Sequence, residues 1–193
     1  MNQSTRRRCS QIAMLLSLML LAGSVASGQD QPKREVIQAI ARGEMRAAGK
    51  LIHITITIES YSTPADQKTL IDAFQSGGHD ALVKALSKMK SRGRVAITGS
   101  LGYQIAYIRN FPGENGRTIR LITDRPINVG EAAAAGRTLD YDLSAVELNL
   151  ASDPKKSQGN LVLAGRFKVD KNNQVTFETY GSGPWRLTNI EER

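Results

Sequence analysis

The stretch Leu51-Ile-His-Ile-Thr-Ile-Thr-Ile-Glu59 decides how the rest of the sequence is interpreted. Isoleucines at positions 52, 54, 56 and 58 alternate with polar or charged residues. A period of two places all four isoleucines on one face of a β-strand. The sequence therefore predicts a strand here, with one apolar face turned toward a core.

A helical segment follows this strand. Thr63 is a good N-cap, Pro64 suits the first helical position, and Asp66 completes a capping-box pattern. Gly77-Gly78 is predicted to end this helix, and a second helix is predicted from Asp80 to about Lys90. The inward residues of this helical hairpin are expected to be Leu70, Ile71, Phe74, Leu82, Val83, Leu86 and Met89.

Beyond this hairpin the apolar pattern changes to a period of two. Strands are predicted at 94–98, 103–111, 117–123, 141–150, 160–169 and 175–180, with an edge strand added at 184–190. Short turns between successive strands favour antiparallel pairing. We therefore expect one α+β domain over residues 50–193: a mostly antiparallel sheet of about seven or eight strands with the helical hairpin inserted after the first strand. Both a barrel and an open sheet satisfy this pattern.

Residues 29–49, which precede this domain, are expected to form a polar, partly helical segment. Apolar residues recur at helical spacing between Glu35 and Ala48, and Gly43 interrupts them. This pattern predicts a short helix.

Residues 1–28 have the organisation of a secretory signal peptide. Three arginines at positions 6–8 precede an apolar run from Ile12 to Ala26, and small residues follow as far as Gly28. The run is shorter than the ~20 residues that a membrane-spanning helix needs. We expect cleavage after Gly28, with a cut after Ala26 as the alternative, and hence a periplasmic or extracellular protein with no stable membrane span.

Composition narrows the classes of function. Cys9 is the only cysteine, so the expected mature chain has no disulfide, thiol nucleophile or thiolate metal site. Cleavage after Gly28 reduces the net charge from +8 to +5, and no long basic block points to nucleic acid. A short basic cluster at Lys88, Lys90, Arg92 and Arg94 fits either a solvated helix end or contact with an anionic envelope surface.

Two motifs that suggest chemistry lack their structural context. Val95 to Gly102 resembles the start of a dinucleotide-binding unit and also a nucleophile elbow, but both need a following helix, and the next residues alternate like a strand. His53 and His79 are too few for a usual zinc site without carboxylates placed beside them. We therefore expect no metal and no cofactor.

Three residues are candidates for ligand binding. Arg125 follows the end of a predicted strand and precedes Pro126, which would hold its guanidinium in place for an anion. Equally, it fixes a turn with Asp124. Trp185 and Arg186 lie in a glycine-rich segment, where the tryptophan either plugs one end of the core or lines a site.

Four segments together resemble a family of small exported bacterial proteins of unknown function. They are TLIDAFQSGGHDALVKAL, LITDRPI, LDYDLSAVELNL and ETYGSGPWRL, in this order. The resemblance runs from about Ile54 to the last residue, and residues 29–51 lie outside it. It implies a secreted α+β domain and supplies no activity, ligand or catalytic residue.

These observations favour a non-catalytic envelope protein that binds an unidentified small molecule or another envelope protein. The alternative is a hydrolase that uses carboxylates from Glu59, Asp124, Asp140 or Asp142. A hydrolase of this kind would gather two carboxylates in a cleft, within the ~5–10 Å that glycosidase pairs span. A structural module that pairs through a sheet edge is a third interpretation.

Overall fold

The computed structural model describes residues 34–44, 47–128, 141–169, 175–179 and 183–193, so the predicted export signal lies outside the described residues. The elements in chain order are β1 (Glu35–Arg42), β2 (Leu51–Ile58), α2 (Pro64–Leu86), β3 (Gly93–Ile97), β4 (Tyr103–Gly113), β5 (Gly116–Thr123), β6 (Leu143–Ala151), η3 (Pro154–Lys156), β7 (Gln158–Val169), β8 (Val175–Thr179) and β9 (Trp185–Glu192). No helix of this described part is long and apolar enough to cross a membrane.

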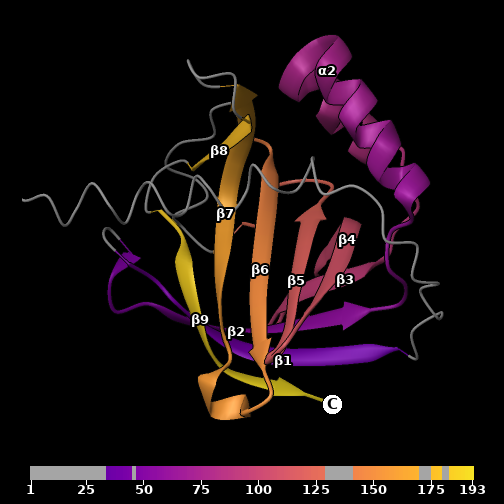
Figure 1. The fold of residues 1–193 in the computed structure, drawn as a ribbon. Coiled ribbons are helices and arrows are strands. Elements are labelled where there is room, and N and C mark those ends of the chain that lie inside the picture. Colours follow the sequence, from indigo (N-terminus) through magenta and orange to yellow (C-terminus); the bar gives the residue numbers. More distant parts are fainter. Residues whose placement is uncertain (1–33, 45–46, 129–140, 170–174, 180–182) are drawn as a thin grey trace, which may run out of the picture.

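Eight strands close into an antiparallel barrel, which Figure 1 shows from the side. The strands β1 to β7 are neighbours in chain order, and β9 completes the ring between β7 and β1. The far end of β7, Gly165–Val169, continues past the ring and pairs with β8. The predicted antiparallel sheet is confirmed, and of the two architectures left open by the sequence it is the barrel that forms.

The helix that the sequence predicted within residues 35–48 does not form in its first part, which is a strand. Glu35–Arg42 is strand β1, and its alternate residues Ile37, Ala39 and Ala41 are buried. The same apolar residues fit a period of two as well as a helical period. Pairing with β2 on one edge and β9 on the other decides between them, because both edges gain a ladder of backbone hydrogen bonds, uninterrupted with β2 and shifted once, between Gln38 and Ile40, with β9.

This extra strand changes two further predictions. The helical insertion comes after the second strand, not the first. The edge strand expected at 184–190 corresponds to β9, Trp185–Glu192, which is paired on both sides, with β1 and with β7. Once β1 is a strand, its free edge provides the partner that places β9 inside the ring.

The start of α2 agrees with the sequence prediction. The Thr63 side chain accepts from the Asp66 N–H, and the Asp66 carboxylate accepts from the Thr63 N–H at 2.7 Å, which completes the capping box. The predicted break also occurs, since Gly77 and Gly78 leave helical geometry and Gly78 has a φ of 65°. The second half then ends at Leu86, earlier than the predicted Lys90.

The molecule has two apolar cores, one on each side of the barrel wall. The inner core fills the barrel with inward residues from every strand of the ring, among them Ile56, Leu148 and Trp185. The outer core lies between α2 and the outer surface of the barrel, and it includes Phe74 and Phe167. Figure 1 shows α2 outside the ring, at the end of the molecule where β8 lies.

Candidate functional site

The barrel interior is packed with side chains. Eight-stranded barrels are just wide enough either to fill with side chains or to hold one small ligand. Here the large inward residues are almost completely buried; they are Trp185, Ile37, Ile54, Ile56, Ile58, Ile105, Ile108, Ile119, Leu121 and Leu148. A ligand inside this barrel would have to displace well-packed apolar side chains, so the candidate site lies outside it.

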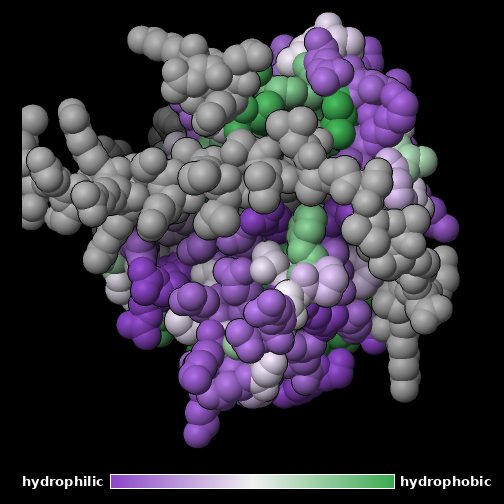
Figure 2. Space-filling model, in the orientation of Figure 1, coloured by the Kyte–Doolittle hydropathy of each residue, from purple (hydrophilic) through white to green (hydrophobic). Residues whose placement is uncertain are grey.

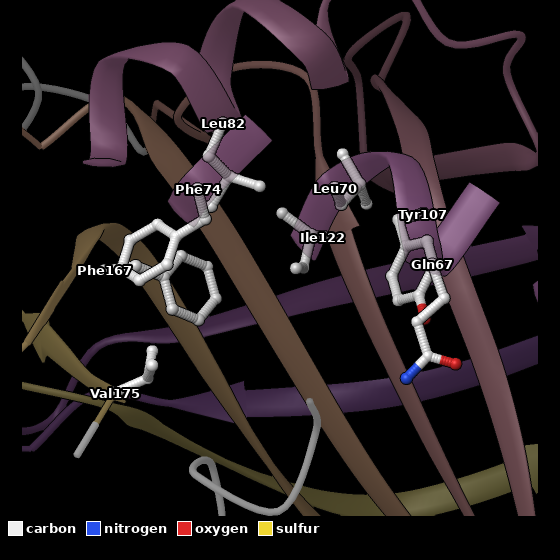
Figure 3. Close-up of a pocket in the computed structure, with 8 residues that line it drawn as sticks. All are labelled: Gln67, Leu70, Phe74, Leu82, Tyr107, Ile122, Phe167 and Val175. Atoms are coloured by element: carbon white, nitrogen blue, oxygen red, sulfur yellow. The ribbon is translucent and has the colours of Figure 1, made fainter. Parts of the chain in front are cut away.

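An apolar cavity of about 40 Å³ lies between α2 and the outer surface of the barrel. Figure 3 shows side chains of α2 facing those of the barrel strands and of β8 across it. Its walls are Gln67, Leu70, Phe74 and Leu82 from α2, with Tyr107, Ile122, Phe167 and Val175 from the sheet. This volume is enough for one or two water-sized groups only.

A larger groove adjoins this cavity where α2 is kinked. Its volume is about 350 Å³, within the range of small-molecule sites. Phe74 and Phe167 contribute to both spaces, so an apolar floor continues from the cavity into the groove. The other groove residues are Gly78, His79, Asp80, Arg166, Lys168 and Val169. Figure 2 shows apolar side chains in a recess beside α2, surrounded by polar ones.

His79 at the kink has both ring nitrogens engaged. Nδ1 accepts from the Phe167 backbone N–H at 3.1 Å, and Nε2 lies 2.6 Å from Asp142 Oδ1. Because Nδ1 is an acceptor, Nε2 carries the proton and donates it to the carboxylate. A general base needs an unoccupied nitrogen facing its substrate, so this pair serves to fix α2 against β7 and the start of β6.

The outer wall of the groove carries a network of charges. Glu178 on β8 accepts from Arg166 at 3.1 Å and from Lys168. The hydrogen bond from Lys168, together with that from Arg166, holds the pKa of the Glu178 carboxyl below its usual value. The Tyr141 ring lies 5.1 Å from the Arg166 guanidinium carbon. The groove thus combines an apolar floor with polar groups that are already ordered.

The three binding residues predicted from the sequence have different neighbours in the structure. Trp185 is 1% exposed and belongs to the inner core, as the core-plug interpretation expected. Arg125 lies beside Asp124 at 3.9 Å and over the Tyr103 ring at 5.7 Å.

Arg186 points outward from β9. Its Nε is 3.2 Å from a carboxylate oxygen of Glu44, and its side chain is more than half exposed. A ligand-binding role for Arg125, Trp185 or Arg186 stays a prediction.

The carboxylates proposed for a hydrolase have separate neighbours. The Asp142 carboxylate binds His79, and the Asp124 carboxylate lies 3.9 Å from Arg125 Nε. The Glu59 N–H bonds to the Arg92 carbonyl, next to β3. Asp140 lies outside the described residues. In the described ranges, no group of three or more histidine, cysteine or acidic side chains is placed to hold a metal ion.

Sequence analysis missed a charged cluster at one opening of the barrel. Arg117 on β5 points inward and binds Glu35 at 2.8 Å, Tyr61 at 3.4 Å and also Glu192. These residues are far apart in the sequence, and Glu35 was assigned to a helix. Arg117 lies on the same strand face as the inward Ile119 and Leu121, which indicates from the sequence that its side chain points into the barrel. Its partner Glu35 could be recognised only once β1 was known to be a strand.

Compared with protein-family models, with curated protein sequences and with solved structures, the chain gives no match.

Proposed function

We propose that this protein is an exported, non-catalytic binding module of the cell envelope. Its ligand is an apolar or amphiphilic small molecule, held between α2 and the outer surface of the barrel. The observation that carries the proposal is the continuous floor of Phe74 and Phe167, which joins the apolar cavity to the wider groove. The export part rests on the pattern of residues 1–28.

The sizes of the two spaces indicate how such a molecule would lie. The groove of about 350 Å³ takes the polar part of the ligand against its ordered charges. The cavity of about 40 Å³ admits an apolar group only if α2 moves outward by a small amount. Gly77 and Gly78 supply a non-helical joint at which the two halves of α2 can shift.

The experiment measures binding of anilinonaphthalene sulfonate, an anionic amphiphile that fluoresces in apolar surroundings. Val175→Glu places a carboxylate in the cavity wall, and we expect the affinity to fall about tenfold or more, because the charge would have to be desolvated. Thr179→Glu adds the same charge to the exposed end of β8, and it should leave the affinity unchanged.

Equal effects of the two substitutions, with both proteins folded, would contradict this site. Mass spectrometry of small molecules that co-purify with the protein then identifies the natural ligand class. For the export part, the N-terminus of secreted protein should be Gln29, or Ser27 as second choice, whereas secreted protein that begins at Met1 would exclude cleavage.

A further inference from the structure

One corner of the barrel's outer surface places cations and leucines side by side. Arg186 on β9 is the register partner of Arg42 on β1, and Arg42 is the partner of Leu51 on β2. Their neighbours Leu187 and Ala41 are completely buried. Because alternate residues of a strand face opposite ways, Arg186, Arg42 and Leu51 all face outward in one row.

The exposed apolar residues concentrate at this corner. Among the described residues, the exposed large apolar side chains are Leu51 at 55%, Leu101 at 91% and Val169 at 50%. Leu101 lies in the connection between β3 and β4, which the bond from the Thr98 N–H to the His53 carbonyl holds beside the start of β2. Two of the three exposed apolar residues therefore share one rim, while Val169 lies at the far end of β7.

Arg186 at this corner pairs with Glu44 at 3.2 Å, whereas the three cations around the two leucines have no acidic partner within the described residues. Arg42, Lys50 and Arg94 are exposed, and in the part of the chain that the structure describes none of them forms an ion pair. Arg94 instead donates from Nη1 to the Leu101 carbonyl at 3.2 Å, so a guanidinium lies at the base of the exposed leucine. We call Arg42, Lys50, Leu51, Arg94 and Leu101 the leucine rim.

We infer that the leucine rim docks on an anionic phospholipid bilayer. A bilayer surface offers negative headgroups to the three cations and hydrocarbon to the two leucines directly beneath. A polyanion would satisfy the cations, but it offers no apolar surface to a leucine exposed as fully as Leu101. This inference uses none of the residues around α2 and stands apart from the proposed ligand site.

The test is co-sedimentation with vesicles, using protein purified from the soluble fraction of cells that express the full chain. Vesicles contain either phosphatidylcholine alone or phosphatidylcholine with phosphatidylglycerol. We expect binding only with phosphatidylglycerol, and we expect it to fall steeply between 50 and 500 mM salt, which screens exposed charges. Each cation contributes about fivefold near such a surface, so Arg42→Gln and Lys50→Gln should each weaken binding by about that factor.

Paired substitutions separate a bilayer from other partners. Leu101→Ser and Leu51→Ser should each reduce binding on the order of tenfold, because the apolar contact with hydrocarbon is lost. Val169→Ser and Lys155→Gln are the matched controls at exposed positions away from the rim, and they should bind like the unchanged protein. If the cation variants lose binding and neither leucine change has an effect, the leucines do not enter the hydrocarbon, and the inferred docking mode is overturned in favour of a contact of charges alone. Equal binding to both vesicle types would overturn the rim's role altogether.

Discussion

Arg117 on β5 reaches across one opening of the barrel to bind Glu35 on β1 at 2.8 Å. These strands are not neighbours in the ring, because β1 pairs with β2 and β9 while β5 pairs with β4 and β6. The same guanidinium binds Glu192 on β9 and donates to the Tyr61 hydroxyl. The Arg117 side chain therefore links β5, on one side of the barrel, to the β1–β9 pair on the opposite side.

We predict that Arg117→Ala lowers the free energy of unfolding by about 1–3 kcal/mol, since it leaves two partly buried carboxylates without their shared partner. The midpoint of urea unfolding measures this. Lys155→Ala, at an exposed lysine, is the control and should have little effect. An unchanged midpoint for Arg117→Ala would mean that the cluster contributes nothing to closing the barrel.

We also predict that the stability of the folded protein depends on alkaline pH through Tyr61, which belongs to the same cluster. Burial, followed by the nearby Glu35 carboxylate, raises the pKa of the Tyr61 hydroxyl above its ordinary value near 10. Above pH 10 the unfolded chain loses this proton while the folded protein keeps it, so stability falls as pH rises. Tyr61→Phe should reduce that fall in urea titrations between pH 8 and 11. Burial also raises the pKa of the Tyr107 hydroxyl, so Tyr107 accounts for any dependence of stability on pH that remains in the Tyr61→Phe variant.

The N-cap of α2 gives a third prediction. Thr63→Ala removes the oxygen that accepts from the Asp66 N–H, and we expect a loss of about 1 kcal/mol in the free energy of unfolding. Thr69→Ala is the matched control, because Thr69 lies inside the helix and its hydroxyl bonds only to the Ala65 carbonyl. Equal effects of both substitutions in chemical denaturation would argue against the capping box.

Arg125 remains to be assigned between binding and structure. Arg125 does not line the cavity or the groove beside α2. A binding role at a separate anion site predicts that Arg125→Ala lowers the affinity for anilinonaphthalene sulfonate and leaves the melting temperature unchanged. The structural role, through Asp124 and the Tyr103 ring, predicts the reverse. Both quantities are measured on the same variant, and a fall in melting temperature alone would exclude the binding role.

The sequence predicted well the features that depend on neighbours along the chain. The capping box at Thr63 and the break at Gly77-Gly78 are confirmed, because both are set by a few adjacent residues. The β3–β9 strands also lie close to their predicted positions, since period-two alternation and short turns are local properties.

Features that depend on distant residues could not be predicted in the same way. Glu35–Arg42 fits both a helix and a strand, and only its pairing with β2 and β9 makes it a strand. The contact of His79 with Asp142 joins residues 63 positions apart, so no local pattern announces it. The groove forms because α2 packs against one part of the barrel, and hydrophobic periodicity does not predict which part.

The seam between β1 and β9 has a consequence for the order of folding. Val36 and Arg193 exchange two backbone hydrogen bonds, so among the described strands the last in chain order, β9, must return to the first, β1. Such distant contacts form slowly, because a long loop must close before any of them is gained. Until β9 arrives, β1 and β7 present unpaired backbone edges that could join other chains. A partly folded chain in which β9 has not yet paired is therefore the stage at which this protein is most exposed to aggregation.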